Sequence, residues 1–163
     1  MRVVMIDNIE KNGVLKDGKF YLPIRVYYED TDAGGVVYYA NYLKFAERAR
    51  TEFVRALGVE QNKGLVSSNP CAFVVRRCEA DYQAPAVLDD QLIVVTELEE
   101  LGAVSAVVRQ NIYRDEKLLV SIKVKVAYIS IEEKKPQRLP PTLNAWYKLT
   151  FAAKDKNSEN AAK

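Results

Sequence analysis

A short acidic stretch, Asp30-Thr31-Asp32-Ala33-Gly34-Gly35, holds the residues of this chain whose types and spacing could do chemistry. It follows a run rich in aromatic and β-branched residues, which predicts a strand, and it precedes Asn41, where apolar spacing begins to predict a helix. If the two glycines let a substrate approach the backbone, the Asp32 carboxylate could act on its carbonyl as a general base or as a nucleophile. Backbone N–H groups at the helix start could stabilise the resulting oxyanion. Because a carboxylate is a weak base, the substrate carbonyl on which it acts must be reactive, and the carbonyl of a thioester meets this requirement.

The same stretch also has a purely structural interpretation. Asp-x-x-Gly is a common turn, in which the Asp32 side chain would only bond to the turn backbone. Strand alternation would place Asp30 and Asp32 on one side, as parts of a solvated acidic loop. Spacing alone leaves these interpretations open beside the catalytic one.

The composition excludes many other kinds of site. The 163-residue chain contains no histidine, so Ser-His-Asp and Cys-His catalytic groups and imidazole zinc sites are absent. The two cysteines, Cys71 and Cys78, cannot form a four-cysteine metal site, and we expect reduced thiols. Gly34-Gly35 is not followed by the Gly-Lys-Ser/Thr of a phosphate-binding loop. We therefore expect neither a metal nor an organic cofactor.

Charge and hydropathy bear on partners and location. The net charge of +2 gives no reason to expect a nucleic-acid partner. The apolar start, Met1 to Ile6, is too short for a signal peptide, and no other run approaches the roughly 18 residues of a membrane span. We therefore expect a cytoplasmic protein that is not integral to the membrane.

The elements that must position the acidic stretch form one α+β domain. Apolar residues recur at steps of three and four over 41–57, which predicts one long helix, with Asn41 capping its start and Gly58 ending it. Strands are expected near 20–28, 71–82, 90–100, 103–114 and 117–131, and their short connections make the sheet antiparallel. Residues 60–69 are predicted to be a loop with at most one helical turn, and 142–149 a short helix.

These elements set the domain boundaries. We expect a single domain over 19–151, preceded by an N-terminal extension of residues 1–18 and followed by a disordered polar tail of residues 152–163. One helix covers only one face of a single sheet well, so oligomer formation is expected.

The stretch from Arg25 to Glu52 resembles, almost without a break, the signature of hotdog-fold acyl-CoA thioesterases. It is most similar to the YbgC-type branch, which is associated with the Tol-Pal system, and more distantly to 4-hydroxybenzoyl-CoA thioesterase. The likeness covers about residues 20–131, including Asp81–Ala86 and Leu88–Asp90. It implies a long central helix wrapped by a five- or six-stranded antiparallel sheet. It also implies homo-oligomers, either dimers or dimers of dimers, with acyl-CoA sites at subunit interfaces.

The resemblance also implies roles for individual residues. It assigns the catalytic carboxylate to Asp32. The residues that it implies for substrate binding are Gly35, Val37, Tyr39, Asn41 and, from a second subunit, Ala72. Tyr39 departs from the branch, in which most sequences have histidine, and a phenol cannot exchange protons at neutral pH. We therefore expect Tyr39 to line the substrate site, with plain packing as the alternative.

Other charged residues have weaker implied roles. Glu47 on the helix is either a rival catalytic acid or a partner of Arg50, of Arg48 or of a neighbouring subunit. The cations eligible to bind the phosphates of coenzyme A are Arg76, Arg77, Arg109, Lys123 and Lys125.

The expected reaction is hydrolysis of an acyl-CoA to a carboxylic acid and free CoA. The sequence leaves two alternatives open. The acyl group could instead be presented on acyl carrier protein, or the domain could be a non-catalytic scaffold of a cell-envelope complex, peripheral at the inner membrane.

Overall fold

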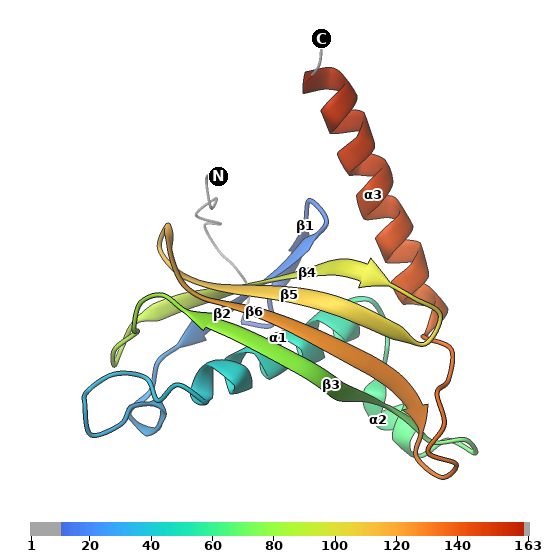
Figure 1. The fold of residues 1–163 in the computed structure, drawn as a ribbon, viewed down its shortest axis with the longest axis horizontal. Coiled ribbons are helices and arrows are strands. Elements are labelled where there is room, and N and C mark those ends of the chain that lie inside the picture. Colours follow the sequence, from blue (N-terminus) through green and yellow to red (C-terminus); the bar gives the residue numbers. More distant parts are fainter. Residues whose placement is uncertain (1–10, 162–163) are drawn as a thin grey trace.

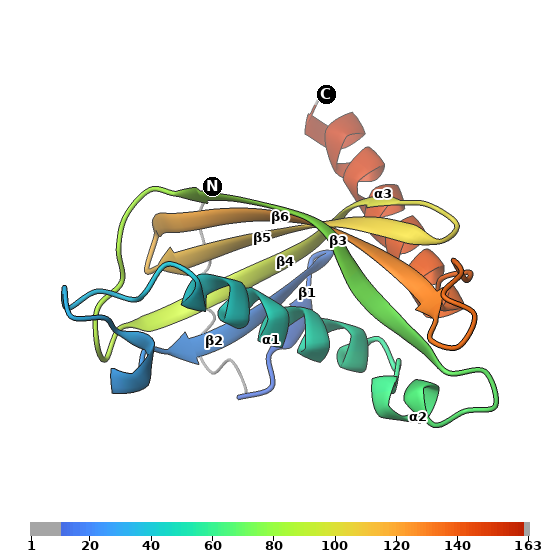
Figure 2. The ribbon, with the colours of Figure 1, turned by 60° about the horizontal axis from the view of Figure 1, so that its bottom comes forward.

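The computed structural model describes residues 11–161, apart from the side chains of 152–160 within the last helix. Its centre is a six-stranded sheet in the order β1-β2-β4-β5-β6-β3, in which every neighbouring pair is antiparallel. The helix α1 (Asn41–Ala56) lies along the concave face of this sheet (Figures 1 and 2). The predicted α+β class and the antiparallel sheet are therefore confirmed.

The elements follow the chain in a simple order. The strands are β1 (Val14–Lys16), β2 (Lys19–Arg25), β3 (Cys71–Tyr82), β4 (Gln91–Leu101), β5 (Ser105–Arg114) and β6 (Lys117–Ser130). The other helices are a short 3₁₀ turn, η1 (Tyr28–Asp30), and the helices α2 (Gln61–Leu65) and α3 (Pro141–Ala161). Apart from β1, which was not predicted, the predicted bounds of every strand agree with the observed bounds to within about three residues, a normal uncertainty at element ends.

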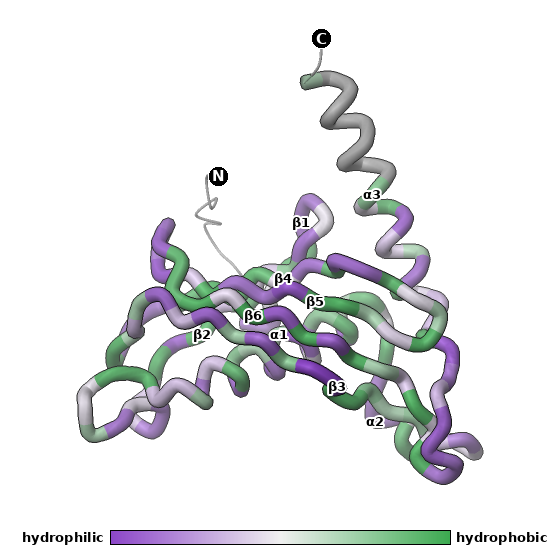
Figure 3. The backbone as a smooth tube through the Cα atoms, viewed as in Figure 1, coloured by the Kyte–Doolittle hydropathy of each residue, from purple (hydrophilic) through white to green (hydrophobic). Residues whose placement is uncertain are grey.

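Helix α1 forms because its apolar residues share one face. The buried positions of α1 recur at steps of three and four and are Tyr42, Phe45, Ala46, Ala49, Phe53 and Val54. They pack on the inward side chains of β2, β4, β5 and β6, where hydrophobic and hydrophilic residues alternate along the chain (Figure 3). This packing fixes α1 over the sheet and so fixes the loop that enters it.

The two ends of α1 differ in how they match the sequence. Gly58 adopts a φ of +83° directly after the helix, so its predicted role in ending the helix is confirmed. The predicted capping by Asn41 is wrong, because Asn41 is already helical and Ala40 is the cap, without a side-chain hydrogen bond. The Asn41 amide instead donates to the carbonyl of Asp30 at 2.8 Å. Asn41 therefore ties the helix start to the acidic stretch.

Strand β3 is a long edge of the sheet. It runs over 12 residues and, within the described part of the chain, pairs only with β6; every residue from Val74 to Tyr82 is exposed. The backbone N–H and C=O groups on its other side have no sheet partner among the described residues. A long exposed edge of this kind is a natural site for pairing with another chain.

Regular secondary structure occurs beyond both ends of the predicted domain range 19–151. Strand β1, which pairs with β2, lies inside the predicted N-terminal extension 1–18, of which residues 1–10 are outside the described part. Helix α3 runs to Ala161, whereas a disordered tail was expected from 152. Its first turns are anchored by buried Leu143 and by Trp146, whose ring centroid lies 6.3 Å from that of Phe53. Because the following residues include no glycine or proline, the helical backbone can continue.

No helix in the described part of the chain is both long and apolar enough to cross a membrane.

Candidate active site

The acidic loop between β2 and α1 is closed by its own backbone. Thr31 and Val37 form an isolated antiparallel bridge, the Asp32 N–H donates to the Val36 carbonyl at 2.9 Å, and the Gly35 N–H donates to the Asp32 carbonyl at 3.0 Å. The chain therefore makes a tight hairpin whose tip is residues 32–35. This hairpin presents the Asp32 side chain to solvent.

The two glycines shape the tip of this hairpin. Asp32 Oδ1 accepts a hydrogen bond from the Gly34 N–H at 2.8 Å, and a Cβ on Gly34 would lie only 3.1 Å from that oxygen. Gly35 has a φ of +79°, which other residues adopt only with strain. The structural interpretation of Asp32 as a turn residue is therefore correct for one carboxylate oxygen. Its Oδ2 has no hydrogen-bond partner among residues 11–161.

Asp30 differs from Asp32 although only one residue separates them. Asp30 is 7% exposed, and its Oδ2 accepts from the Tyr27 N–H at 2.8 Å. Its carbonyl accepts from the Tyr38 N–H at 2.9 Å and from the Asn41 amide. The interpretation of the pair as one solvated acidic loop is thus wrong. Asp30 holds the loop together, and Asp32 is the exposed acid.

The loop that leads into α1 contains both used and unused backbone donors. The Val37 N–H donates to Ala86 O and the Asn41 N–H donates to Tyr38 O, so these two predicted substrate-binding residues have no N–H group to spare. The N–H groups of Tyr39 and Ala40 make no hydrogen bond to any residue in the described range. The unused donors of this loop thus include those of Tyr39 and Ala40, at the positive end of the helix dipole. Sequence reasoning did not single out Ala40, because its position depends on where the helix begins.

Tyrosine side chains surround these donors. Tyr39 is 61% exposed, and its ring centroid lies 4.9 Å from that of Tyr38 and 6.1 Å from that of Tyr82. The Tyr82 hydroxyl donates to the Tyr39 carbonyl at 3.1 Å, which links the end of β3 to the loop. A hydrogen bond with the Tyr39 side chain raises the pKa of Tyr38, and burial raises the pKa of Tyr82. Both phenols therefore stay neutral at physiological pH and cannot serve as bases.

A second loop, between β3 and β4, is hydrogen-bonded to the loop that enters α1 and to α1 itself. Ala86 is fully buried, and its N–H donates to the Tyr42 hydroxyl at 2.9 Å while its carbonyl accepts from Val37. Asp90 bonds to Arg114 at 2.7 Å and accepts from the Val87 N–H at 2.9 Å, which fixes the end of this loop. The acidic hairpin thus rests on the main body of the sheet.

Ala72 is the one predicted site residue that lies elsewhere. It sits near the start of β3, where it pairs with Ile129, whereas Tyr82 at the other end of β3 contacts the Tyr39 loop. Ala72 and Tyr82 are ten positions apart along the extended strand, roughly 33 Å at about 3.3 Å per residue. Within one chain, Ala72 is therefore remote from the other five residues of the predicted site.

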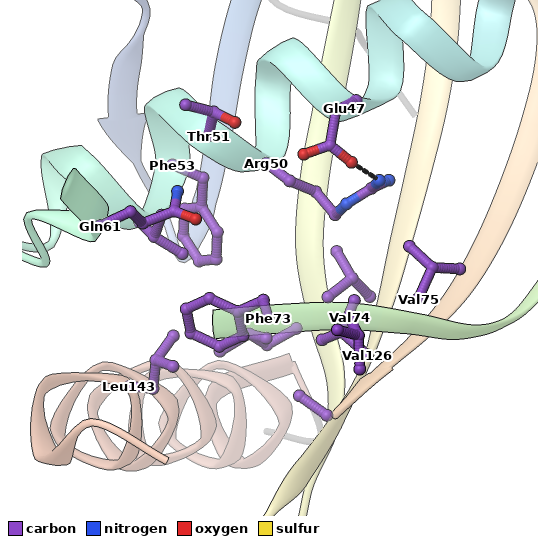
Figure 4. A pocket seen from close by; sticks show the side chains of 14 residues that line it. Glu47, Arg50, Thr51, Phe53, Gln61, Phe73, Val74, Val75, Val126 and Leu143 are labelled. Atoms are coloured by element: carbon purple, nitrogen blue, oxygen red, sulfur yellow. Dashed lines mark hydrogen bonds and ion pairs between the residues drawn. The ribbon is translucent and has the colours of Figure 1, made fainter. Parts of the chain in front are cut away.

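A pocket of about 580 Å³, including its open mouth, lies between α1 and the first half of β3 (Figure 4). Sequence reasoning did not predict this pocket. Its wall is mainly apolar, with Phe53, Val54, Leu143 and the side chains of β3 to β6. Glu47 and Arg50 reach it from α1 and form an ion pair with each other, so the predicted pairing of Glu47 with Arg50 is confirmed.

The cations considered for phosphate binding do not converge on the acidic loop. Arg109 and Lys123 both pair with Glu99, at 3.2 and 3.4 Å, and Arg77 pairs with Glu79 at 2.7 Å. Arg109 and Lys123 thus link β5 and β6 to β4, whereas the Arg77–Glu79 pair lies within β3, and no single cation stands out as a phosphate ligand.

Comparison with known proteins gives consistent matches. Residues 34–121 match the family model of the thioesterase superfamily. The acyl-CoA thioesterase YbgC of Haemophilus influenzae is 44% identical over 129 residues, which cover 79% of this chain and 94% of that protein. The acyl-CoA thioester hydrolase YbgC of Escherichia coli O157:H7 is 43% identical over 130 residues, covering 79% and 96%. The crystal structure of a probable thioesterase from Bartonella henselae has a TM-score of 0.70 and 39% identity, covering 74% of this chain and 98% of that one.

Proposed function

Because this chain belongs to the thioesterase superfamily, we propose that it hydrolyses acyl-CoA thioesters to a carboxylic acid and free CoA, with Asp32 as the catalytic carboxylate. The hotdog fold predicted from the sequence is confirmed by the antiparallel sheet around α1 and by the likeness to solved thioesterases. The observation that carries the proposal is that one loop, between β2 and α1, holds both the Asp32 Oδ2 and the N–H groups of Tyr39 and Ala40, none of which has a hydrogen-bond partner in the described part of the chain.

In the proposed reaction, Asp32 works in one of two ways. As a general base, its Oδ2 takes a proton from water while the water oxygen attacks the thioester carbonyl. As a nucleophile, Oδ2 attacks the carbonyl itself and forms a mixed anhydride, which water then hydrolyses. Both routes release CoA as a thiolate that takes up a proton, and both leave a carboxylic acid. Neither route uses a metal or an organic cofactor.

The oxyanion that forms on the thioester carbonyl needs hydrogen-bond donors. The N–H groups of Tyr39 and Ala40 fit this need, because they are unused and lie at the N-terminal end of a 16-residue helix. The hydrogen bond from Tyr82 to the Tyr39 carbonyl supports this peptide segment. Gly35 and the exposed Tyr39 ring would line the entry to the site.

The complete site requires two copies of the chain. We expect β3 of one copy to pair with β3 of another in antiparallel fashion, because this strand has a free edge and exposed residues throughout its second half. Pairing about the middle of the strand brings the Tyr82 end of one β3 beside the Ala72 end of the other. Asp32 of each subunit then faces the pocket of its partner, which would take the acyl chain. Two such dimers could join into a dimer of dimers.

For other partners and the cellular location, the proposal rests on the resemblance of the Arg25–Glu52 stretch to YbgC-type sequences. The YbgC-type likeness favours a cytoplasmic protein that acts at the inner face of the cell envelope with the Tol-Pal system. An acyl group carried on acyl carrier protein remains an alternative to acyl-CoA.

The direct test is an assay of the purified protein on matched acyl-CoA and acyl-carrier-protein substrates, with detection of the free thiol. We expect release of CoA from several acyl-CoAs at rates well above the uncatalysed reaction. Turnover of the carrier-protein substrates alone would replace the proposed substrate. A lack of turnover with every thioester would refute hydrolysis and favour the non-catalytic scaffold.

A further inference from the structure

A fixed polar pair is set into the wall of the apolar pocket between α1 and β3. The side chains of Arg50 and Glu47 project from α1 beside Val74 and Val75 (Figure 4). Most of the surrounding wall consists of valine, leucine and phenylalanine side chains. A charged pair in such a wall is costly unless its groups are hydrogen-bonded, so its polar atoms constrain what the pocket can hold.

Gln110 of β5 fixes the orientation of Arg50. Gln110 is fully buried, and its Nε2 donates to the Ala46 carbonyl at 2.8 Å and to Thr96 Oγ1 at 3.0 Å. Its Oε1 accepts from Arg50 Nη1 at 2.7 Å. Because the Ala46 carbonyl can only accept and Arg50 can only donate, the amide cannot turn over without losing both partners. The guanidinium of Arg50 is therefore held in one place from inside the core.

The Arg50–Glu47 pair lines the pocket and keeps unused hydrogen-bonding capacity. Arg50 donates to Gln110 and to Glu47, and its side chain is 14% exposed. A guanidinium has five N–H donors, and those that remain make no hydrogen bond within residues 11–161. Glu47 is 59% exposed and has a second carboxylate oxygen without a partner in the same range. Unused donors and an unused acceptor thus lie side by side.

We propose that the Arg50–Glu47 pair is a specificity determinant that selects acyl groups carrying a hydroxyl. This inference rests on the proposed function, in which the pocket takes the acyl chain. A hydroxyl both accepts and donates, so it can accept from Arg50 and donate to Glu47 at once. A plain alkyl or phenyl group would cover the Arg50 donors without replacing their hydrogen bonds to water. A carboxylate would meet an already neutralised cation and would compete with Glu47.

The test compares acyl groups that differ only in the hydroxyl. The aliphatic arm uses butanoyl-CoA and 3-hydroxybutanoyl-CoA, the aromatic arm uses benzoyl-CoA and 4-hydroxybenzoyl-CoA, and succinyl-CoA provides the carboxylate. We expect the wild type to favour the hydroxylated member of one arm by at least about tenfold in kcat/KM. The arm in which this occurs identifies the acyl class. Arg50→Met should bring this ratio close to one, whereas Arg48→Met, on an exposed position of the same helix, should leave it unchanged.

Binding measurements keep the inference separate from the proposed function. Calorimetry with non-hydrolysable thioether analogues of the same pairs should give the same preference in binding affinity, whether or not the protein hydrolyses the corresponding thioesters. A ratio near one in both arms, or tighter binding of the succinyl analogue, would overturn the hydroxyl selection even if all the thioesters are hydrolysed. If Arg50→Met does not fold, two measurements still test the hydroxyl selection. One is the set of wild-type ratios, and the other is the ratio of the Glu47→Gln variant, whose side chain is largely exposed at the pocket.

Discussion

The Asp32→Asn variant is expected to lose at least about 10²-fold in kcat/KM for acyl-CoA hydrolysis, the scale of a positioned acid–base group. The reason lies in the two carboxylate oxygens. Oδ1 accepts from the Gly34 N–H, and the carbonyl oxygen of asparagine can keep that hydrogen bond. Oδ2 becomes an amide nitrogen, which can neither take a proton from water nor attack a carbonyl. The measurement is steady-state kinetics with detection of free CoA.

This substitution separates the two interpretations of Asp32. Because the turn hydrogen bond survives, the thermal unfolding midpoint should stay within a few degrees of the wild type. Asp115→Asn is the matched control, since Asp115 is also exposed in a turn and its φ of +52° suits asparagine. Activity equal to that of the control would show that Asp32 serves the turn alone.

The Ala80→Pro variant is expected to weaken dimer formation by roughly 10²-fold in dissociation constant and to lose activity with it. The N–H of Gln83 donates to Leu119 of the neighbouring strand, and antiparallel pairs alternate, so the N–H of Ala80 points to the free edge. Proline there removes the outward donor while sparing the pairing with β6. Light scattering over a range of concentrations and thiol-release kinetics measure the two effects.

Ala80→Thr is the control for this prediction, because threonine keeps the N–H and suits an exposed strand position. We expect it to remain dimeric and active. A proline variant that dissociates to monomers with full activity would rule out a shared site. A proline variant that stays dimeric at nanomolar concentration would show that another surface forms the dimer.

The sequence was most informative where local periodicity and tertiary packing agree. The recurrence of Tyr42, Phe45, Ala49 and Phe53 predicted α1 because the same spacing is what buries one face of a helix on the sheet. The extent of α3 was not predictable in this way. Its anchor is the contact of Trp146 with Phe53, far away in the chain, and its polar second half gives no signal of its own. Strand β1 has only three residues, too few for a pattern.

The candidate site likewise combines features that the local sequence predicted with features that depend on tertiary contacts. A turn at Asp32 followed from the residue types, but the burial of Asp30 did not, because its partner is the Tyr27 N–H exposed by the η1 turn. Which backbone donors remain unused depends on the carbonyls of Asp30 and Ala86, which only the fold brings near. The pairing of Arg50 with Gln110 joins residues 60 positions apart and had no local signal.

The central claim is that each active site combines Asp32 of one subunit with the pocket of its partner, and subunit mixing tests it most directly. One variant is Asp32→Asn. The other is Thr51→Trp, which fills the pocket from α1 without altering β3. Each variant alone should be inactive, since every site then contains a defect. In a mixed dimer, one site combines the intact Asp32 with the intact pocket.

After subunit exchange of equal amounts, half of the dimers are mixed and each has one intact site, so activity should recover to about a quarter of the wild type. Mixed activity no higher than the sum of the separate variants would contradict a shared site and place the whole site within one subunit. Full activity of Thr51→Trp alone would contradict the assignment of the pocket to the acyl chain.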